Sequence, residues 1–405
     1  MENKMHIPFS PPDISEAEVQ AVAQALRSGW ITTGPRVKEL EIRLADYVRA
    51  DRVCCFNSQT ASSEMALRLL GIGPGDEVIT CAYTYTATAS VVCHVGAKLV
   101  LVDCQKQSLQ MDYDALESAI TEKTKAIIPV DLGGVPCDYD RIFAIAEAKK
   151  HLFRPANPLQ EAMGRMVILA DGAHALGASR KGAMVGSIAD FTAFSFHAVK
   201  NLTTAEGGAL AWKKIGGVDS DILYRQLQML SLHGQSKDAF AKSQANAWEY
   251  DVLGPWYKCN MTDVAGTMGL AQLDRYDAML AHRRKIIALY DEALKPLGVG
   301  VLPHETAEHV SSAHLYLTWI PGITQDHRNE IIARMGQAGI ACNVHYKPLP
   351  MLTAYKNLGF TIADYPNAYG MFTNEITLPL YSKLTVEQAA YVIDHFVRIV
   401  KDYLP

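Results

Sequence analysis

The chain has 405 residues, 49% apolar and 20% charged, which is enough for a large core and two domains. Lys and Arg number 38 and Asp and Glu 43, and this net charge of −5 gives no reason to expect nucleic acid or an anionic membrane as a partner. The sequence has neither a basic-then-apolar leader nor an apolar run of bilayer length, so we expect a cytoplasmic protein. The eight cysteines form no C-x-x-C pair and fit no common zinc spacing, so we expect neither a disulfide nor a metal site.

The predicted elements begin with a helix at Ser15, because Ser15 and Glu18 have the spacing of a capping box, and Gly29 ends this helix. A second helix is expected from about Arg36 to Val48, and strands and helices alternate from there. The predicted strands are Arg52–Phe56, Glu77–Cys81, Lys98–Val102, Lys125–Val130, Met166–Ala170, Phe191–Phe196 and Ala209–Trp212. The helices between them are Thr60–Leu70, Thr86–Val95, Tyr113–Ile120 and Tyr139–Lys149.

These strands are nearly continuous apolar runs, which predicts an α/β fold with a mainly parallel sheet covered by helices on both faces. Ligands of such sheets bind beyond the carboxyl ends of the strands. Residues 152–164 are expected to form a surface insertion, and residues 217–260 a long polar excursion. Helix is expected from Thr262 to Ala281 and on to about Leu294.

The C-terminal part of the chain predicts a second, smaller α+β unit. It contains a strand at His314–Ile320, a helix at Gln325–Gln337, a further strand, and a final helix from Thr385. We therefore expect an N-terminal arm and large domain over residues 1–285, and a small domain over residues 286–405.

A polar segment from Asn57 to Ser63 joins a strand to the start of a helix. Free N–H groups and the positive end of the helix dipole can seat a phosphate there, although an ordinary Ser/Thr helix cap is the alternative. The segment contains no G-x-G-x-x-G and no Walker lysine, so no motif indicates a dinucleotide or P-loop site.

Asp171 ends an apolar strand, and His174 follows three residues later. A carboxylate at this position can pair with a protonated pyridine nitrogen, and the histidine can lie over the same ring or bond its phenolic oxygen. Asp and His are also metal ligands, but no third or fourth ligand occurs at a suitable spacing.

Lys200 follows the Phe-rich strand and precedes the Gly207-Gly208 pair. Most lysines are solvated surface residues, but a lysine at a strand end can be made partly neutral and form an imine with a carbonyl. Ser195 can donate its hydroxyl to a phosphate or simply fill the strand. Tyr85 follows another strand end and can stack on a flat ring, although lone aromatics are more often part of the core.

These residues resemble the DegT/StrS-type nucleotide-sugar aminotransferases, which are fold-type I enzymes that use pyridoxal phosphate (PLP). The resemblance runs nearly from end to end. Its blocks are Arg27–Pro35, Asn57–Ala61, Asp171–Ala175, Phe194–Asn201, Tyr257–Asp263, Gly269–Leu273, His345–Leu349 and Leu378–Tyr381.

The resemblance implies a role for each matching residue. Lys200 would bind PLP covalently and move the catalytic proton, Asp171 would face the pyridine nitrogen, and His174 would contact the ring substituents. Tyr85 would stack on the ring, and Thr60, Ala61 and Ser195 would hold the phosphate. Asn260 would reach the phosphate of a neighbouring subunit, which implies a homodimer with shared active sites, and Lys258 and His345 would lie near the sugar nucleotide.

The chain departs from the family pattern at Gln59, Trp256, Cys259 and the Asp131–Gly134 segment. The departures around Trp256 and Asp131 are expected to border the sugar site. None removes a catalytic group. We expect transfer of an amino group from glutamate to a nucleotide-linked keto sugar, with the Lys258/Asn260 segment favouring carbon 4. There are three alternatives: a PLP lyase or dehydrase, a non-catalytic PLP-binding regulator, and a cofactor-free protein that binds another phosphate. Dehydrases of this family typically have histidine in place of the lysine, so Lys200 speaks against the first.

Overall fold

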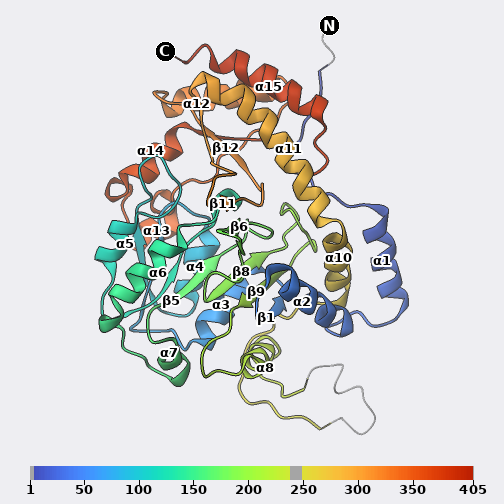
Figure 1. The fold of residues 1–405 in the computed structure, drawn as a ribbon, viewed down its shortest axis with the longest axis vertical. Coiled ribbons are helices and arrows are strands. Elements are labelled where there is room, and N and C mark those ends of the chain that lie inside the picture. Colours follow the sequence, from blue (N-terminus) through green and yellow to red (C-terminus); the bar gives the residue numbers. More distant parts are fainter. Residues whose placement is uncertain (1–3, 238–248, 405) are drawn as a thin grey trace.

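The computed structural model describes residues 4–237 and 249–404. Its centre is a sheet with the strand order β1-β9-β8-β5-β4-β2-β3 (Figure 1). The strands are β1 Arg52–Phe56, β2 Glu77–Cys81, β3 Lys98–Val102, β4 Thr124–Ile128, β5 Val167–Asp171, β8 Phe191–Ser195 and β9 Gly208–Trp212. Strand β9 is antiparallel to β1 and β8, and the other neighbouring pairs are parallel. The predicted α/β class with a mainly parallel sheet is confirmed.

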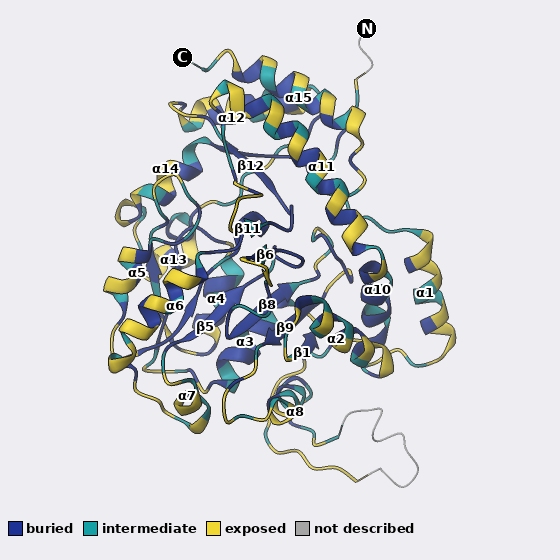
Figure 2. Ribbon diagram, in the orientation of Figure 1, coloured by how far each residue is buried: buried dark blue, intermediate teal, exposed yellow. Residues whose placement is uncertain are grey.

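Helices cover both faces of this sheet, and the buried strands lie between them (Figure 2). The helices of this unit are α2 Pro35–Val48, α3 Gln59–Leu69, α4 Thr86–His94, α5 Tyr113–Ala119, α6 Tyr139–Ala148, α7 Pro158–Met163, α8 Ser220–Ser231 and α10 Asp263–Asp274. Side chains alternate along the strands, so that Cys54 and Phe56 pack in the core with α3 and α4, while Val53 and Cys55 pack with α2 and α10.

A smaller antiparallel sheet lies in the C-terminal part, with the order β10-β12-β13. Its strands are β10 Gly300–Val301, β12 Tyr316–Trp319 and β13 Glu375–Leu378, and the helices around it are α11 Tyr276–Leu294, α12 Gln325–Gln337, α13 Thr353–Asn357, α14 Pro366–Asn374 and α15 Val386–Val400. A separate apolar cluster joins Ile7 to residues between 286 and 400. Helix α11 runs through residue 285, and the domain division there stays a prediction.

Shorter elements connect these units. The strands β6 Ser179–Arg180, β7 Ala183–Met184 and β11 His309–Val310 form a small sheet, and 3-10 turns are η1 Leu132–Gly134, η2 Lys150–Leu152, η3 Lys295–Leu297, η4 Leu349–Met351 and η5 Ile362–Asp364. Helix α1 Glu16–Arg27 begins with the predicted capping box. The N-terminal arm pairs with the small unit, because Ile7 N donates to Gly339 O and Ala341 N donates to Ile7 O.

Two segments differ from the sequence-based expectation. The expected polar excursion at 217–260 contains α8, which buries Leu223 and Leu227, while residues 238–248 lie outside the described residues. The expected surface insertion at 152–164 contains the short helix α7, capped by Asn157 and begun by Pro158. The polar surroundings of α8 hide its narrow apolar stripe, whereas the prolines at 155 and 158 hide α7, whose one buried residue is Gln160.

Within residues 4–237 and 249–404, none of the helices is both long enough and apolar enough to cross a bilayer. The same residues contain no group of three His, Cys, Asp or Glu side chains that could hold a metal ion. All eight cysteines are free thiols, and most are buried.

Candidate functional site

The carboxyl ends of the central strands and the N-terminus of α3 surround one cavity of about 350 Å³. A smaller cavity of about 30 Å³ adjoins it, because Lys200, Tyr85 and Tyr346 line both. The larger cavity is lined by Ser58, Gln59, Thr60, Tyr85, Ala87, Ala173, Ser195, His197, Val199, Lys200, Glu206, Gly207 and Tyr346. Asp171 and His174 line the smaller one. Six of the predicted site residues therefore meet at the expected edge of the sheet.

Lys200 lies in the turn after β8, where its N–H donates to His197 O at 2.9 Å. Burial lowers the pKa of its amine to about 8, and the nearby Asp171 carboxylate opposes this shift. An appreciable fraction of the amine is therefore neutral near pH 7, and a neutral amine can attack a carbonyl carbon.

Asp171 is the buried last residue of β5. Thr88 Oγ1 donates to its Oδ2 at 2.6 Å, and Ala173 N donates to its Oδ1 at 3.1 Å. Burial raises the pKa of the carboxyl group, while these two hydrogen bonds and Lys200 act in the opposite direction. A cationic ring nitrogen beside Asp171 would further favour the ionised carboxylate.

His174 bonds through both ring nitrogens. Gly133 N donates to its Nδ1 at 3.1 Å, so the proton of the neutral ring is assigned to Nε2, which lies 3.2 Å from Tyr346 Oη. Burial and the charge of Lys200 lower the pKa of His174 well below its usual value. The imidazole is therefore a neutral hydrogen-bond donor toward Tyr346. Its predicted contact with the ring substituents of a cofactor stays a prediction.

The predicted phosphate seat lies at the N-terminus of α3, and its binding of phosphate stays a prediction. Ser58 is the N-cap, and its Oγ accepts from Ala61 N at 3.0 Å, so the Ala61 N–H is already bonded within the protein. The earlier N–H groups of a helix have no acceptor inside it, and here Gln59 and Thr60 line the cavity. A Cβ atom on Gly208 would lie 2.3 Å from Gln59 N, so this glycine allows β9 to approach the seat closely.

Four predicted residues, Ala61, Lys258, Asn260 and His345, do not line either cavity. Lys258 is exposed, and its Nζ bonds Asn260 Oδ1. Asn260 Nδ2 also donates to Thr33 Oγ1. His345 Nδ1 lies 2.9 Å from Thr377 Oγ1, and the His345 ring stacks on Phe9 at 5.4 Å between centroids. Burial and Lys200 lower the pKa of His345 to about 3.

The Asp131 side chain lines neither cavity, so its expected place at the border of the sugar site stays a prediction. Asp131 is fully buried beneath the strand end, where it accepts from Cys137 N at 2.8 Å and from Tyr139 Oη. Burial raises its pKa to about 7. The other expected border residue, Trp256, does not line the cavity either.

The sequence did not indicate Thr88 or Tyr346 as site residues. Thr88 lies in a predicted helix and Tyr346 in a segment that resembles the family, and neither context indicates a site role. In the folded chain, Thr88 lies beside Asp171 and Tyr346 lies beside His174.

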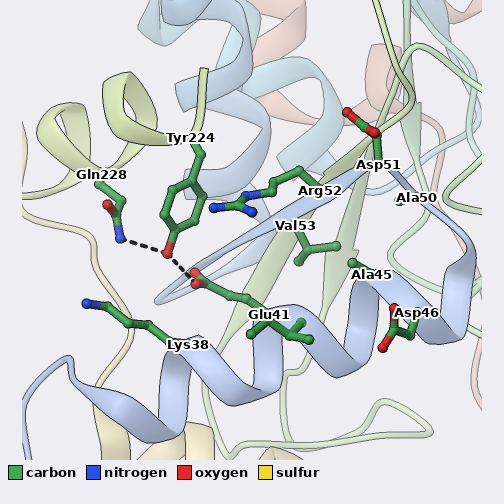
Figure 3. A pocket seen from close by; sticks show the side chains of 11 residues that line it. Lys38, Glu41, Ala45, Asp46, Ala50, Asp51, Arg52, Val53, Tyr224 and Gln228 are labelled. Carbon is green, nitrogen blue, oxygen red and sulfur yellow. Dashed lines mark hydrogen bonds between the residues drawn. The ribbon is translucent and has the colours of Figure 1, made fainter. Parts of the chain in front are cut away.

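A second cavity, of about 420 Å³, lies at the opposite, starting end of β1, between α2 and α8 (Figure 3). Glu41 at its base accepts from Tyr224 Oη at 2.6 Å and from Cys55 N at 2.8 Å. These bonds join α2, α8 and β1, and they satisfy a buried carboxyl group. Their role is structural, and the chemistry-bearing residues lie around Lys200.

The chain is similar to known proteins over nearly its whole length. The model of the DegT/DnrJ/EryC1/StrS aminotransferase family matches residues 12–397. The chain is 37% identical to the spore coat polysaccharide biosynthesis protein SpsC of Bacillus subtilis (strain 168) over 98% of this chain and 97% of that protein. Among solved structures, it resembles Spr1654 of Streptococcus pneumoniae, a candidate sugar aminotransferase, in its PMP form, with 55% identity and a TM-score of 0.96 over 98% of this chain and 100% of the other.

A more distant structure is PseC of Helicobacter pylori, an aminotransferase of pseudoaminic acid biosynthesis. It is 26% identical with a TM-score of 0.85, covering 98% of this chain and all of the other. Spr1654 has also been solved in a PLP form. These likenesses confirm the predicted fold-type I architecture.

Proposed function

The chain belongs to the DegT/DnrJ/EryC1/StrS aminotransferase family of PLP-dependent enzymes, and from this premise we propose that it transfers an amino group from glutamate to a nucleotide-linked keto sugar, at carbon 4. The product would be an amino sugar for glycan, lipopolysaccharide or secondary-metabolite synthesis. The names of SpsC and PseC, which refer to polysaccharide and sugar-acid biosynthesis, support a sugar acceptor. The cytoplasmic location stays a prediction.

One observation carries the proposal: Lys200, Asp171 and the start of α3 surround the same connected cavities. The donors fit PLP, because an amine with a pKa of about 8 suits its aldehyde, a buried carboxylate suits its ring nitrogen, and a helix N-terminus suits its phosphate. When bound, PLP withdraws electrons from the carbon that carries the amine, so that this carbon can lose a proton.

Each residue of the site has a separate proposed role. Lys200 holds the cofactor and moves a proton on and off the substrate carbon. Asp171 would keep the ring nitrogen of bound PLP protonated, and Tyr85 would stack on the ring. Thr60 and Ser195 hold the phosphate, and Ala61 contributes by fixing the Ser58 cap. Lys258 and His345 bind the sugar nucleotide.

The direct test is borohydride reduction of PLP-loaded protein followed by peptide mapping, with the label expected on Lys200. Lys200→Ala should abolish the release of 2-oxoglutarate from glutamate while leaving the fold intact by circular dichroism. Lys295→Ala, on an exposed lysine far along the chain, is the matched control. A label on another residue, or substantial turnover by Lys200→Ala, would contradict the assignment.

The acceptor is tested with a panel of nucleotide 4-keto and 3-keto sugars in the presence of glutamate. The proposal predicts a product whose mass shows an amino group in place of the keto oxygen of a 4-keto sugar. Loss of water without gain of nitrogen would indicate a dehydrase, and PLP binding without any turnover would indicate a regulator.

We propose further that two copies share their active sites through Asn260. Lys200→Ala and Asn260→Ala subunits, co-expressed with different tags, would place one intact site in each mixed dimer. Since half of the dimers are mixed, the preparation should regain about a quarter of the wild-type activity. Two inactive variants that fail to restore each other would place Asn260 and Lys200 in the same subunit's site.

A further inference from the structure

Helix α4 places two side chains at the candidate site from its first turn. Tyr85 is the N-cap and lines the cavity, and Thr88, one turn later, lies behind Asp171. Thr88 Oγ1 donates to Asp171 Oδ2 at 2.6 Å, and both residues are buried, with exposed fractions of 1% and 5%. The hydrogen bond therefore lies away from water, where a bond to a charged group is strongest.

A second threonine completes this chain of hydroxyl groups. Thr84 Oγ1 lies 2.9 Å from Thr88 Oγ1, and Thr84 is also buried. A hydroxyl group has one proton to donate, and an ionised carboxylate can only accept. If Asp171 is ionised, Thr88 must donate to it and accept from Thr84, so Thr84 orients the hydroxyl of Thr88.

Thr88 and the Ala173 N–H hold the two carboxylate oxygens of Asp171 from different sides. Ala173 N is fixed by the backbone, so Thr88 is the side chain that determines the orientation of Oδ2. Burial favours the neutral form of this carboxyl group. The hydrogen bond that Thr88 donates to Oδ2 favours the ionised form instead.

We propose that Thr88 is a positioning residue that acts through Asp171, keeping its carboxylate ionised and fixed in the orientation in which it would pair with the pyridine nitrogen of PLP, with Thr84 orienting Thr88. The inference rests on the role proposed for Asp171. It extends the site by the hydroxyl groups of Thr88, behind Asp171, and of Thr84, which lines the smaller cavity.

The experiment compares PLP with its 1-deaza analogue, in which a C–H group replaces the pyridine nitrogen. Dissociation constants are measured on cofactor-free protein by tryptophan fluorescence, for wild type, Thr88→Val and Thr88→Ser. Thr88→Val keeps the shape and removes the donor. We expect it to weaken PLP binding by about tenfold or more and to change binding of the deaza analogue by less than about twofold. Thr88→Ser should restore the preference for PLP.

Two further variants test the route of the effect. Thr84→Val should reduce the preference for PLP by a smaller factor, since Thr88 keeps its own hydroxyl group. In an Asp171→Asn background, Thr88→Val should cause no additional loss, because the acceptor charge is already gone. Thr84→Val also keeps the inference testable should Thr88→Val fail to fold.

An equal loss of affinity for both cofactors in Thr88→Val, or an unchanged preference in Thr88→Val and Thr84→Val, would overturn the inference and leave Thr88 as a packing residue. Failure of the proposed function gives a different result, because wild-type protein would then neither bind PLP nor be labelled at Lys200. A wild type that binds PLP but does not distinguish it from the deaza analogue would remove the role of Asp171, and the inference with it.

Discussion

The phenol oxygen of Tyr346 lies 3.2 Å from Nε2 of His174, and the two rings are nearly parallel with centroids 6.2 Å apart. The centroids of the Tyr346 and Tyr85 rings are 5.6 Å apart. Tyr346 therefore lies between Tyr85, which is predicted to stack on the cofactor ring, and His174, which is predicted to contact its substituents. Because Gly133 N occupies Nδ1, Tyr346 Oη is the acceptor of the one proton on the neutral imidazole.

Tyr346→Phe removes this acceptor and leaves the buried Nε2–H group of His174 without it. We expect a loss of about tenfold in kcat, since an unsatisfied buried donor costs about 1–3 kcal/mol, with Lys200 still labelled by borohydride. Steady-state kinetics and labelling measure the two effects. Tyr369→Phe, on an exposed tyrosine, is the control, and a Tyr346→Phe enzyme with wild-type kcat would contradict the role.

The acid–base behaviour of Lys200 gives a pH prediction. Its pKa is lowered to about 8 by burial, and the neutral amine is the form that reacts. The rate at which cofactor-free protein captures PLP should therefore rise about tenfold per pH unit below pH 7 and level off near pH 9. An ordinary lysine would continue to gain rate toward pH 10.

Stopped-flow absorbance measures this capture rate. Asp171→Asn removes the charge that raises the pKa of Lys200, so its profile should shift to lower pH. A wild-type rate that still increases above pH 10 would show that Lys200 lies in a solvated environment.

Gly208 tests the phosphate seat. A Cβ at this position would lie 2.3 Å from Gln59 N and from Ser58 C, so Gly208→Ala must push the start of α3 away from β9. We expect PLP to bind at least about tenfold more weakly, and pyridoxal, which has no phosphate, to lose much less. Equilibrium titration of both compounds measures the difference. Gly216→Ala is the matched control because nothing lies within 4 Å of its added Cβ, and equal losses for both compounds would argue against the seat.

Much of the fold was predictable because its signals are local. The strands at Arg52–Phe56, Glu77–Cys81 and Lys98–Val102 have the predicted bounds, since each is a short apolar run between polar or turn residues. Helix α8 was missed because its buried stripe is narrow and its surroundings are polar. Helix α7 was missed because its prolines suggested a loop, although Pro158 occupies the first turn, where proline is favourable.

The site divides in the same way. Asp171 is the last residue of β5 and Lys200 lies in the turn that follows β8, so the parallel sheet brings them to one edge, as the sequence predicts. Thr88 and Tyr346 lie 83 and 172 residues from their partners, and a threonine inside a helix carries no local sign of a distant carboxylate. Such pairs depend on how the helices pack on the sheet, which the sequence pattern leaves undetermined.

Glu41 gives a prediction about stability. Burial raises its pKa to about 7 from the ordinary value of 4.5, and its hydrogen bonds with Tyr224 and Cys55 only partly oppose this. Between these two values the folded state binds more protons than the unfolded state, so stability falls as pH rises through this window, and the loss is complete above pH 7. The shift corresponds to at most about 3 kcal/mol.

Glu41→Gln resembles the protonated side chain and cannot ionise. Relative to wild type, its melting temperature should therefore rise by a few degrees between pH 5 and pH 8. Thermal melts at both pH values measure the change. Glu39→Gln, on an exposed carboxylate of the same helix, should show no such trend. A difference between Glu41→Gln and wild type that stays constant with pH would mean that Glu41 titrates normally, with water reaching the carboxyl group through the cavity in Figure 3.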